Sequence, residues 1–135
     1  MGAESRHVER LRVAWIDTDA GGRIHFTAAF RYAERAETAL LRKLDLVDRL
    51  VDYPRRRVEA DFRAVLRFED EVAVAIRPAR VGTTSITWVW EISREGEVCV
   101  DGSHTVVHVG ADGRPAPLPN EVRERLGAVA DEQLV

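Results

Sequence analysis

Four segments in the second half of the sequence alternate apolar and polar residues with a period of two, which is the pattern of half-buried strands. Turn signals at Gly82 and at 95–97 separate the last three of these segments. Short turns between successive strands imply an antiparallel meander. The strands are predicted at 57–63, 71–78, 85–92 and 98–109.

The first half of the sequence predicts one more strand, over 7–16, and a helix over 28–44. The helix is rich in alanine, which is the best helix former and lets a helix lie close to another surface. Shorter helical segments are expected at 47–51 and, capped by Asn120, at 121–129. One helix followed by a run of strands predicts a single α+β domain over residues 1–135, with the helix on one face of the sheet.

Composition excludes several classes of function. A formal net charge of -3 argues against a general nucleic-acid binder. The single cysteine, Cys99, excludes an internal disulfide framework and a cysteine-built zinc site. No apolar run reaches the roughly 20 residues that a membrane span needs, and the first residues lack the apolar core of a signal peptide. We therefore expect a cytoplasmic protein that binds neither membranes nor nucleic acid.

Between the first strand and the helix lies the run Asp17-x-Asp19-x-Gly21-Gly22, which three motifs could explain. In a calcium-binding EF-hand loop, the twelfth position should be a glutamate, but it is Ala28, and a strand rather than a helix precedes it. The Asp-x-Asp signature of haloacid-dehalogenase phosphotransfer requires a parallel doubly wound sheet, whereas the later strands here are antiparallel. The third motif belongs to hotdog-fold thioesterases.

The run 17–22, followed by a helix that contains Phe30-Arg31-Tyr32-Ala33-Glu34-Arg35-Ala36-Glu37, resembles the 4-hydroxybenzoyl-CoA thioesterase family. Members commonly read Asp-x-Asp-x-x-Gly, then an aromatic stretch, then the long helix, and the ending at 113–123 is similar too. The resemblance covers nearly the whole chain. It implies a hotdog fold, in which an antiparallel sheet of about five strands wraps around one long central helix. It also implies a homodimer or homotetramer with active sites at the subunit interface.

Carried over residue by residue, the resemblance implies that Asp19 is the nucleophile, or the base for a water, that attacks a thioester carbonyl. Backbone N–H groups near Phe26, at the helix start, match the donors that stabilise the developing oxyanion. Asp17 matches the first aspartate of the motif and is expected to be structural. His25 is expected to contact substrate or line the pocket. No metal and no cofactor are implied.

Further residues are expected around the substrate. Glu37 lies close to the apolar stripe of the helix. The resemblance makes it or Glu34 a possible alternative base, because some hotdog enzymes carry the catalytic carboxylate on this helix, although an ordinary solvated or ion-paired helix glutamate is the simpler interpretation. The run 55–57 could bind coenzyme A phosphates or be a solvated charge run. His104 and His108, about 13 Å apart at strand rise, cannot share one metal and are expected to be structural. The substrate-binding set is predicted to be Gly22, Ile24, Glu37, Arg80 and Thr83, where Arg80 and Thr83, on the turn around Gly82, are implied by the resemblance alone.

The sequence thus predicts an acyl-thioester hydrolase that cleaves thioesters of coenzyme A or of an acyl-carrier protein. Two alternatives stay open. A hotdog hydratase or dehydratase would use His25, and a non-catalytic acyl-binding or dimerisation module would share the scaffold, since fold does not fix function. Trp88 and Trp90, which are two positions apart on one strand, are expected in the core or a subunit interface.

Overall fold

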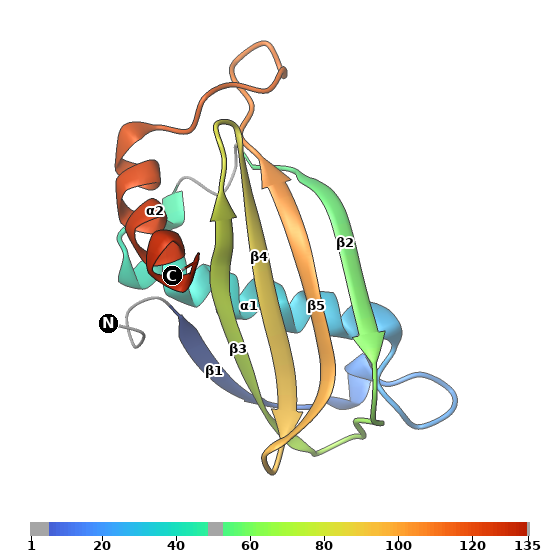
Figure 1. The fold of residues 1–135 in the computed structure, drawn as a ribbon. Coiled ribbons are helices and arrows are strands. Elements are labelled where there is room, and N and C mark those ends of the chain that lie inside the picture. Colours follow the sequence, from blue (N-terminus) through green and yellow to red (C-terminus); the bar gives the residue numbers. More distant parts are fainter. Residues whose placement is uncertain (1–5, 49–52, 135) are drawn as a thin grey trace.

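The computed structural model describes residues 6–48 and 53–134. Within these ranges, five antiparallel strands form one sheet in the order β1-β3-β4-β5-β2 (Figure 1). Helix α1 (Phe26–Lys43) lies across one face of this sheet, and α2 (Asn120–Leu134) packs beside β3. The predicted α+β architecture, a sheet around one long helix, is confirmed. The strands are β1 (His7–Arg12), β2 (Arg55–Phe62), β3 (Glu71–Val81), β4 (Ser85–Arg94) and β5 (Glu97–Val107).

The predicted meander is correct for β3, β4 and β5 and wrong for β2. Tight turns join β3 to β4 and β4 to β5, and tight turns place consecutive strands side by side. Residues 63–70 instead form a longer connection, which carries the chain from one edge of the sheet to the other side of β4. As a result β2 pairs with β5, with Val58 opposite His104. The outer edge of β2 remains without a partner strand in the described chain.

The alanine-rich face of α1 is the centre of the core. Ala28, Ala29, Ala33 and Ala36 are completely buried and belong to the same cluster as Trp88 and Trp90. Phe30 of α1 meets the Trp90 ring edge to face, with the ring centroids 5.9 Å apart. Because the small alanine side chains let the helix approach the indoles closely, the two tryptophans fill the space between helix and sheet.

Close packing also explains a glycine in β5. A Cβ on Gly102 would lie 2.6 Å from the Trp90 ring on one side and would overlap the Glu59 carbonyl oxygen on the other. Gly102 is opposite Trp90 on β4 and Ala60 on β2. Only glycine permits both neighbours at this position.

Several boundaries differ from those predicted. The first strand ends at Arg12, and a 3-10 turn, η1 (Trp15–Asp17), replaces its predicted end because the Asp17 side chain accepts a hydrogen bond from the Ala14 amide (3.2 Å). Strand β3 continues past Pro78 with a register shift, which is possible because β1 pairs no further than Ile76.

At the C-terminal end the last strand stops at Val107, short of the predicted limit, because residue 109 instead pairs with Pro115 across a turn. The final helix is longer than predicted and reaches Leu134. The predicted turn at 47–51 lies mostly outside the described residues. None of the helices in the described ranges has the length and apolar character needed to cross a membrane.

Candidate active site

Asp17 anchors the segment that leads into α1. The Tyr32 hydroxyl donates to one carboxylate oxygen (2.7 Å) and Arg31 donates to the other (3.3 Å). Burial alone would raise the pKa of Asp17, but the hydrogen bonds from Tyr32, the Ala14 amide and Arg31 outweigh it and lower this pKa. Burial and the same contact raise the pKa of the Tyr32 hydroxyl. Through these contacts Asp17 holds the turn η1 against helix α1.

Asp19 lies at the tip of a tight hairpin, where its backbone N–H donates to the Arg23 carbonyl (2.8 Å). Its Oδ1 accepts from the Gly21 amide at 2.8 Å and from the Arg23 amide at 3.4 Å. Gly22 closes the hairpin with φ of 83°, a conformation that favours glycine. Asp19 is exposed, and its Oδ2 accepts no hydrogen bond from the described part of the chain. One carboxylate oxygen is therefore fixed and the other is free.

The first turn of α1 follows directly. His25 caps the helix, because its Nδ1 accepts from the Thr27 amide at 3.3 Å, and its ring stacks on Phe26 with the centroids 4.8 Å apart. No described residue accepts a hydrogen bond from the Phe26 N–H. Such unpaired amides carry the positive end of the helix dipole. The helix start can therefore stabilise a negatively charged oxygen.

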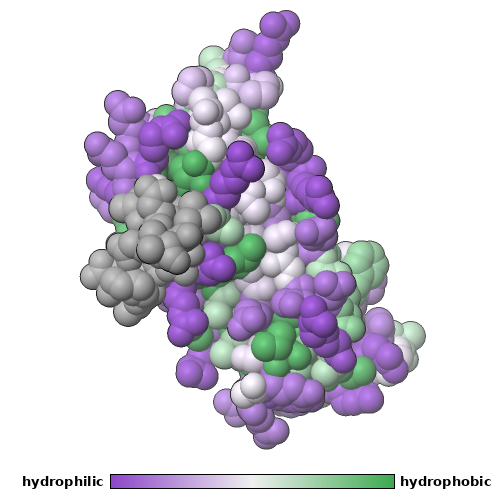
Figure 2. All heavy atoms as spheres, in the orientation of Figure 1, coloured by the Kyte–Doolittle hydropathy of each residue, from purple (hydrophilic) through white to green (hydrophobic). Residues whose placement is uncertain are grey.

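A groove of about 530 Å³ joins this hairpin to the end of β2. Most of the residues that line it are apolar. Two of these residues are exposed to solvent, Phe26 at 61% and Phe62 at 48%. Figure 2 shows hydrophobic side chains among hydrophilic ones in the lower half of the molecule, where Figure 1 places the end of β2. The groove is lined by Asp19, Arg23, Ile24, His25, Phe26, Phe62, Arg63, Ala64, Val65, Leu66 and Val100.

The groove thus brings together four of the predicted site residues: Asp19, Ile24, His25 and Phe26. Gly22 belongs to the adjoining hairpin. The structure places the other predicted residues elsewhere. Arg80 and Thr83 lie at the β3–β4 turn, at the opposite end of the molecule from this hairpin (Figure 1). There the Thr83 carbonyl accepts hydrogen bonds from Leu118 and Arg123, which fasten α2.

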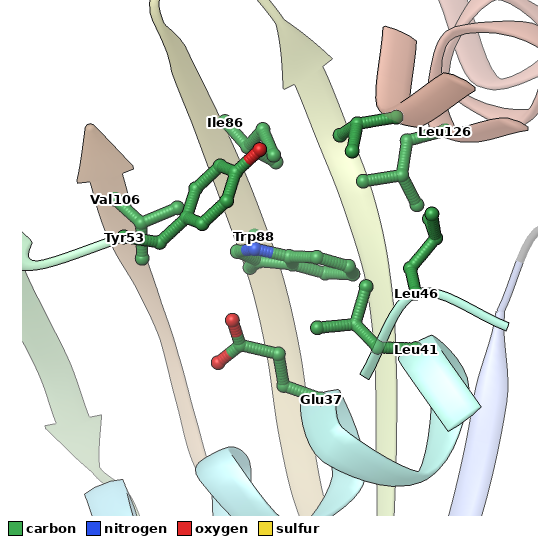
Figure 3. A pocket seen from close by; sticks show the side chains of 9 residues that line it. Glu37, Leu41, Leu46, Tyr53, Ile86, Trp88, Val106 and Leu126 are labelled. Atoms are coloured by element: carbon green, nitrogen blue, oxygen red, sulfur yellow. The ribbon is translucent and has the colours of Figure 1, made fainter. Parts of the chain in front are cut away.

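Glu37 also lies away from Asp19. It is eleven residues after Phe26 on α1, or about 16 Å along the helix, and is only 2% exposed. Figure 3 shows its carboxylate directed toward the sheet, beside Tyr53 and Trp88. These residues line a second cavity of only about 20 Å³, together with Leu41, Leu46, Ile86, Val106, Val122 and Leu126. This space is sufficient for about one water molecule.

A buried charge cluster holds Glu37, and sequence analysis missed its partners. Glu37 accepts from Arg55 at 2.6 Å, and its Oε1 lies 2.9 Å from His104 Nε2. Burial would raise the pKa of Glu37, but the hydrogen bonds from His104 and Arg55 lower it overall. The cluster connects α1 to β5 and β2. The contiguous arginines at 55–57 gave no signal that the first of them reaches the buried Glu37.

Comparison with known proteins identifies the family. The model of the thioesterase-like superfamily matches residues 13–126. A predicted thioesterase from Bacillus stearothermophilus is 28% identical, with 91% of this chain and 95% of that chain covered and a TM-score of 0.81. A thioesterase from Thermus thermophilus, solved in complex with coenzyme A and zinc, is 27% identical, with 93% of this chain and 94% of that chain covered and a TM-score of 0.83.

A third structure shares the fold at lower identity. A 1,4-dihydroxy-2-naphthoyl-CoA thioesterase from Synechocystis is 18% identical, covers 90% of this chain and 96% of that chain, and has a TM-score of 0.82. No functionally curated protein matches the chain at a significant level. The family match spans most of the sequence and agrees with the hotdog sheet. The chain therefore belongs to the thioesterase-like superfamily.

Proposed function

We propose that this protein hydrolyses the thioester of an acyl-coenzyme A, or of an acyl-carrier protein, and that Asp19 drives the attack. The observation that carries the proposal is the free Oδ2 of Asp19 at the wall of an open, mainly apolar groove. The hairpin fixes the other oxygen of the carboxylate through two backbone amides. A carboxylate held in this way keeps its orientation while one oxygen remains available for chemistry.

The proposed reaction adds water across the carbonyl–sulfur bond. Oδ2 of Asp19 either takes a proton from a water whose oxygen attacks the carbonyl carbon, or attacks that carbon itself and forms an anhydride that water then cleaves. In both routes the carbon–sulfur bond breaks, the thiol leaves with a proton, and a free carboxylic acid remains. The Phe26 amide and the positive end of α1 stabilise the negative charge on the carbonyl oxygen.

Coenzyme A is supported as the thiol carrier by the Thermus thermophilus relative, which was solved with this coenzyme and is 27% identical. The acyl group is assigned to the groove rather than to the protein interior. The alanine face of α1 is packed into the same core cluster as the indoles of Trp88 and Trp90, and the cavity beside Glu37 is only about 20 Å³. Among the described residues, the cavity beside Glu37 is therefore too small to hold an aliphatic chain.

We further propose that two copies pair through the free edge of β2. This strand is unpaired on its outer side and carries exposed apolar side chains, Val58 and Phe62. An exposed strand edge is a ready template for pairing with another chain. Antiparallel pairing would bring the groove of one subunit near the start of β2 in the other. The end that carries Arg80 and Thr83 would then face the Asp19 end of the partner.

The test is thiol release from a panel of acyl-coenzyme A esters, short, long and aromatic, by the wild type and by Asp19→Asn. We expect turnover on one class and a loss of about a hundredfold or more in the variant. Asp112→Asn is the matched control, because Asp112 also accepts a hydrogen bond from the amide two residues later, next to a glycine with φ of 79°, but outside the groove. It should retain full activity.

Three results would contradict the assignment. Activity that survives Asp19→Asn but is lost in His25→Ala would favour a histidine-based hydratase or dehydratase, and loss in Glu37→Gln alone would move the base to the buried cluster. Absence of turnover on both coenzyme A and carrier-protein thioesters, with retained acyl binding, would favour the non-catalytic module.

For the assembly, sedimentation should show a dimer that Val58→Lys dissociates.

A further inference from the structure

Two arginines face each other beside the Asp19 hairpin. Arg23 and Arg67 are opposite one another in an isolated antiparallel bridge, and the Ile24 amide donates to the Leu66 carbonyl next to it (2.9 Å). Directly opposed residues in such a bridge have their side chains on the same face, about 5 Å apart at Cβ. Both arginines are exposed.

The neighbouring carboxylates are already occupied by other partners. Asp70 accepts from Arg94 at 3.0 Å and from the Arg67 backbone amide at 2.8 Å, and Glu69 pairs with Arg12 at 3.7 Å. Within residues 6–48 and 53–134, no carboxylate lies within 4.0 Å of the guanidinium of Arg23 or Arg67. Like charges directly opposite each other destabilise a bridge. The described part of the fold therefore holds two positive charges near each other with no carboxylate in contact with either.

This pair lies over the same glycine turn as Asp19. The position that a Cβ on Gly21 would take is 3.3 Å from Asp19 Oδ1 and 3.7 Å from Arg23 Nε. The corresponding position on Gly22 is 3.9 Å from Arg67 Nη1. Because neither glycine has a side chain, the space between the carboxylate and the guanidinium groups stays open. Arg23 also lines the groove itself.

We propose that Arg23 and Arg67 form a subsite for a carboxylate on the acyl group, so that the preferred substrate is an acyl thioester that carries a second, free carboxylate. This inference rests on the proposed hydrolysis at Asp19. Guanidinium groups bind carboxylates through paired, charge-assisted hydrogen bonds. Because the same Gly21 position is 3.3 Å from Asp19 Oδ1 and 3.7 Å from Arg23 Nε, these two atoms are at most 7.0 Å apart, a separation that a short dicarboxylic acyl chain spans. The phosphates of coenzyme A are separated from the thioester by the whole pantetheine arm.

The experiment uses four substrates: the adipyl and heptanoyl thioesters of coenzyme A and of N-acetylcysteamine. Adipyl and heptanoyl chains have similar length but differ in the terminal carboxylate, and N-acetylcysteamine lacks the phosphates. The variants are Arg23→Gln, Arg67→Gln and the double substitution. Arg10→Gln is the control, an exposed arginine on β1 at the other edge of the sheet.

The wild type should prefer both adipyl esters. The double substitution should lower kcat/KM for both of them by about tenfold or more, chiefly through KM, as expected for a lost charged hydrogen bond. Heptanoyl esters and the Arg10→Gln control should be unaffected. Raising the salt concentration should weaken the preference for adipyl in the wild type.

Three outcomes would overturn the subsite. Equal losses for both acyl groups on coenzyme A, with none on N-acetylcysteamine, would assign the pair to the coenzyme phosphates. Unchanged kcat/KM on all four substrates would leave the arginines without a ligand. A loss accompanied by a change in sedimentation would assign them to a subunit contact. Failure of the underlying proposal is recognised separately, because Asp19→Asn would then hydrolyse all four esters at the wild-type rate.

Discussion

Glu37 Oε1 lies 2.9 Å from His104 Nε2, and both side chains are only 3% exposed. The carboxylate also accepts from Arg55 at 2.6 Å, so one buried group connects the helix to two strands. Removal of one member of a buried charge cluster leaves the remaining charge uncompensated, which is more costly than the loss of a surface pair.

Glu37→Ala should lower the free energy of unfolding by about 3 kcal/mol. Glu34→Ala is the matched control, because Glu34 lies one turn earlier on α1 and approaches the same Arg55 at 3.7 Å, but its side chain is 64% exposed. Its effect should stay below about 1 kcal/mol. Urea unfolding of both variants measures the difference. Equal effects would show that the cluster adds no more stability than a surface ion pair.

The same carboxylate predicts a pH dependence of stability. The pKa of Glu37 in the folded protein is below the value of 4.5 for a free side chain. A lowered folded-state pKa means that the unfolded chain binds the proton first as pH falls, so the stabilisation is complete above about pH 4.5 and is lost below it. Unfolding curves of the wild type and Glu37→Gln, measured from neutral to acidic pH, should therefore converge as the pH falls through the folded pKa. A constant gap between them would contradict the assignment.

The two aspartates of the motif should separate stability from activity. Asp17→Ala removes the hydrogen bonds from Tyr32, Arg31 and the Ala14 amide, and should cost about 2 kcal/mol of stability. Asp19→Ala removes only contacts within an exposed hairpin and should change the melting temperature little, while abolishing hydrolysis. Thermal unfolding and thiol release on the same preparations test both statements. A large loss of stability in Asp19→Ala would make that residue structural.

Two glycines should respond in opposite ways to the same substitution. Gly102→Ala places a methyl group 2.6 Å from the Trp90 ring and against the Glu59 carbonyl, and should destabilise the protein by about 3 kcal/mol. Gly127→Ala, in α2, meets nothing within 4 Å and should stabilise the helix by about 1 kcal/mol. Denaturation midpoints compare the two variants. A neutral Gly102→Ala would mean that β2 and β5 can move apart.

Local patterns were sufficient for much of this fold. The period of two placed the strands of the second half, and the alanine-rich segment placed α1, because burial on one face leaves a direct mark on the sequence. The segment that holds Asp19 was also placed correctly between the first strand and the helix, although its hairpin was not predicted. The family resemblance supplied the roles assigned to Asp19, His25 and Phe26, which remain predictions.

Features that depend on distant pairing were not visible. The sequence of residues 63–70 carries no signal that this connection crosses the sheet. For this reason β2 was predicted beside β3, whereas it pairs with β5. The partners of Glu37 come from segments that are far apart in sequence, and an arginine that binds a buried carboxylate cannot be told in the sequence from one that binds only solvent. For the same reason the opposition of Arg23 and Arg67 appears only after the hairpin has folded against the 63–70 connection.

The groove beside Asp19 is lined partly by core residues, Ile24, Leu66 and Val100, and partly by side chains outside the core. Phe26 and Phe62 are exposed, whereas the tryptophans and alanines that stabilise the sheet against α1 are buried elsewhere. Substitution of such wall residues changes the shape of the groove while leaving the buried packing intact. At these exposed positions ligand preference can therefore change one residue at a time while the protein stays folded, whereas Ile24, Leu66 and Val100 serve both the groove and the core.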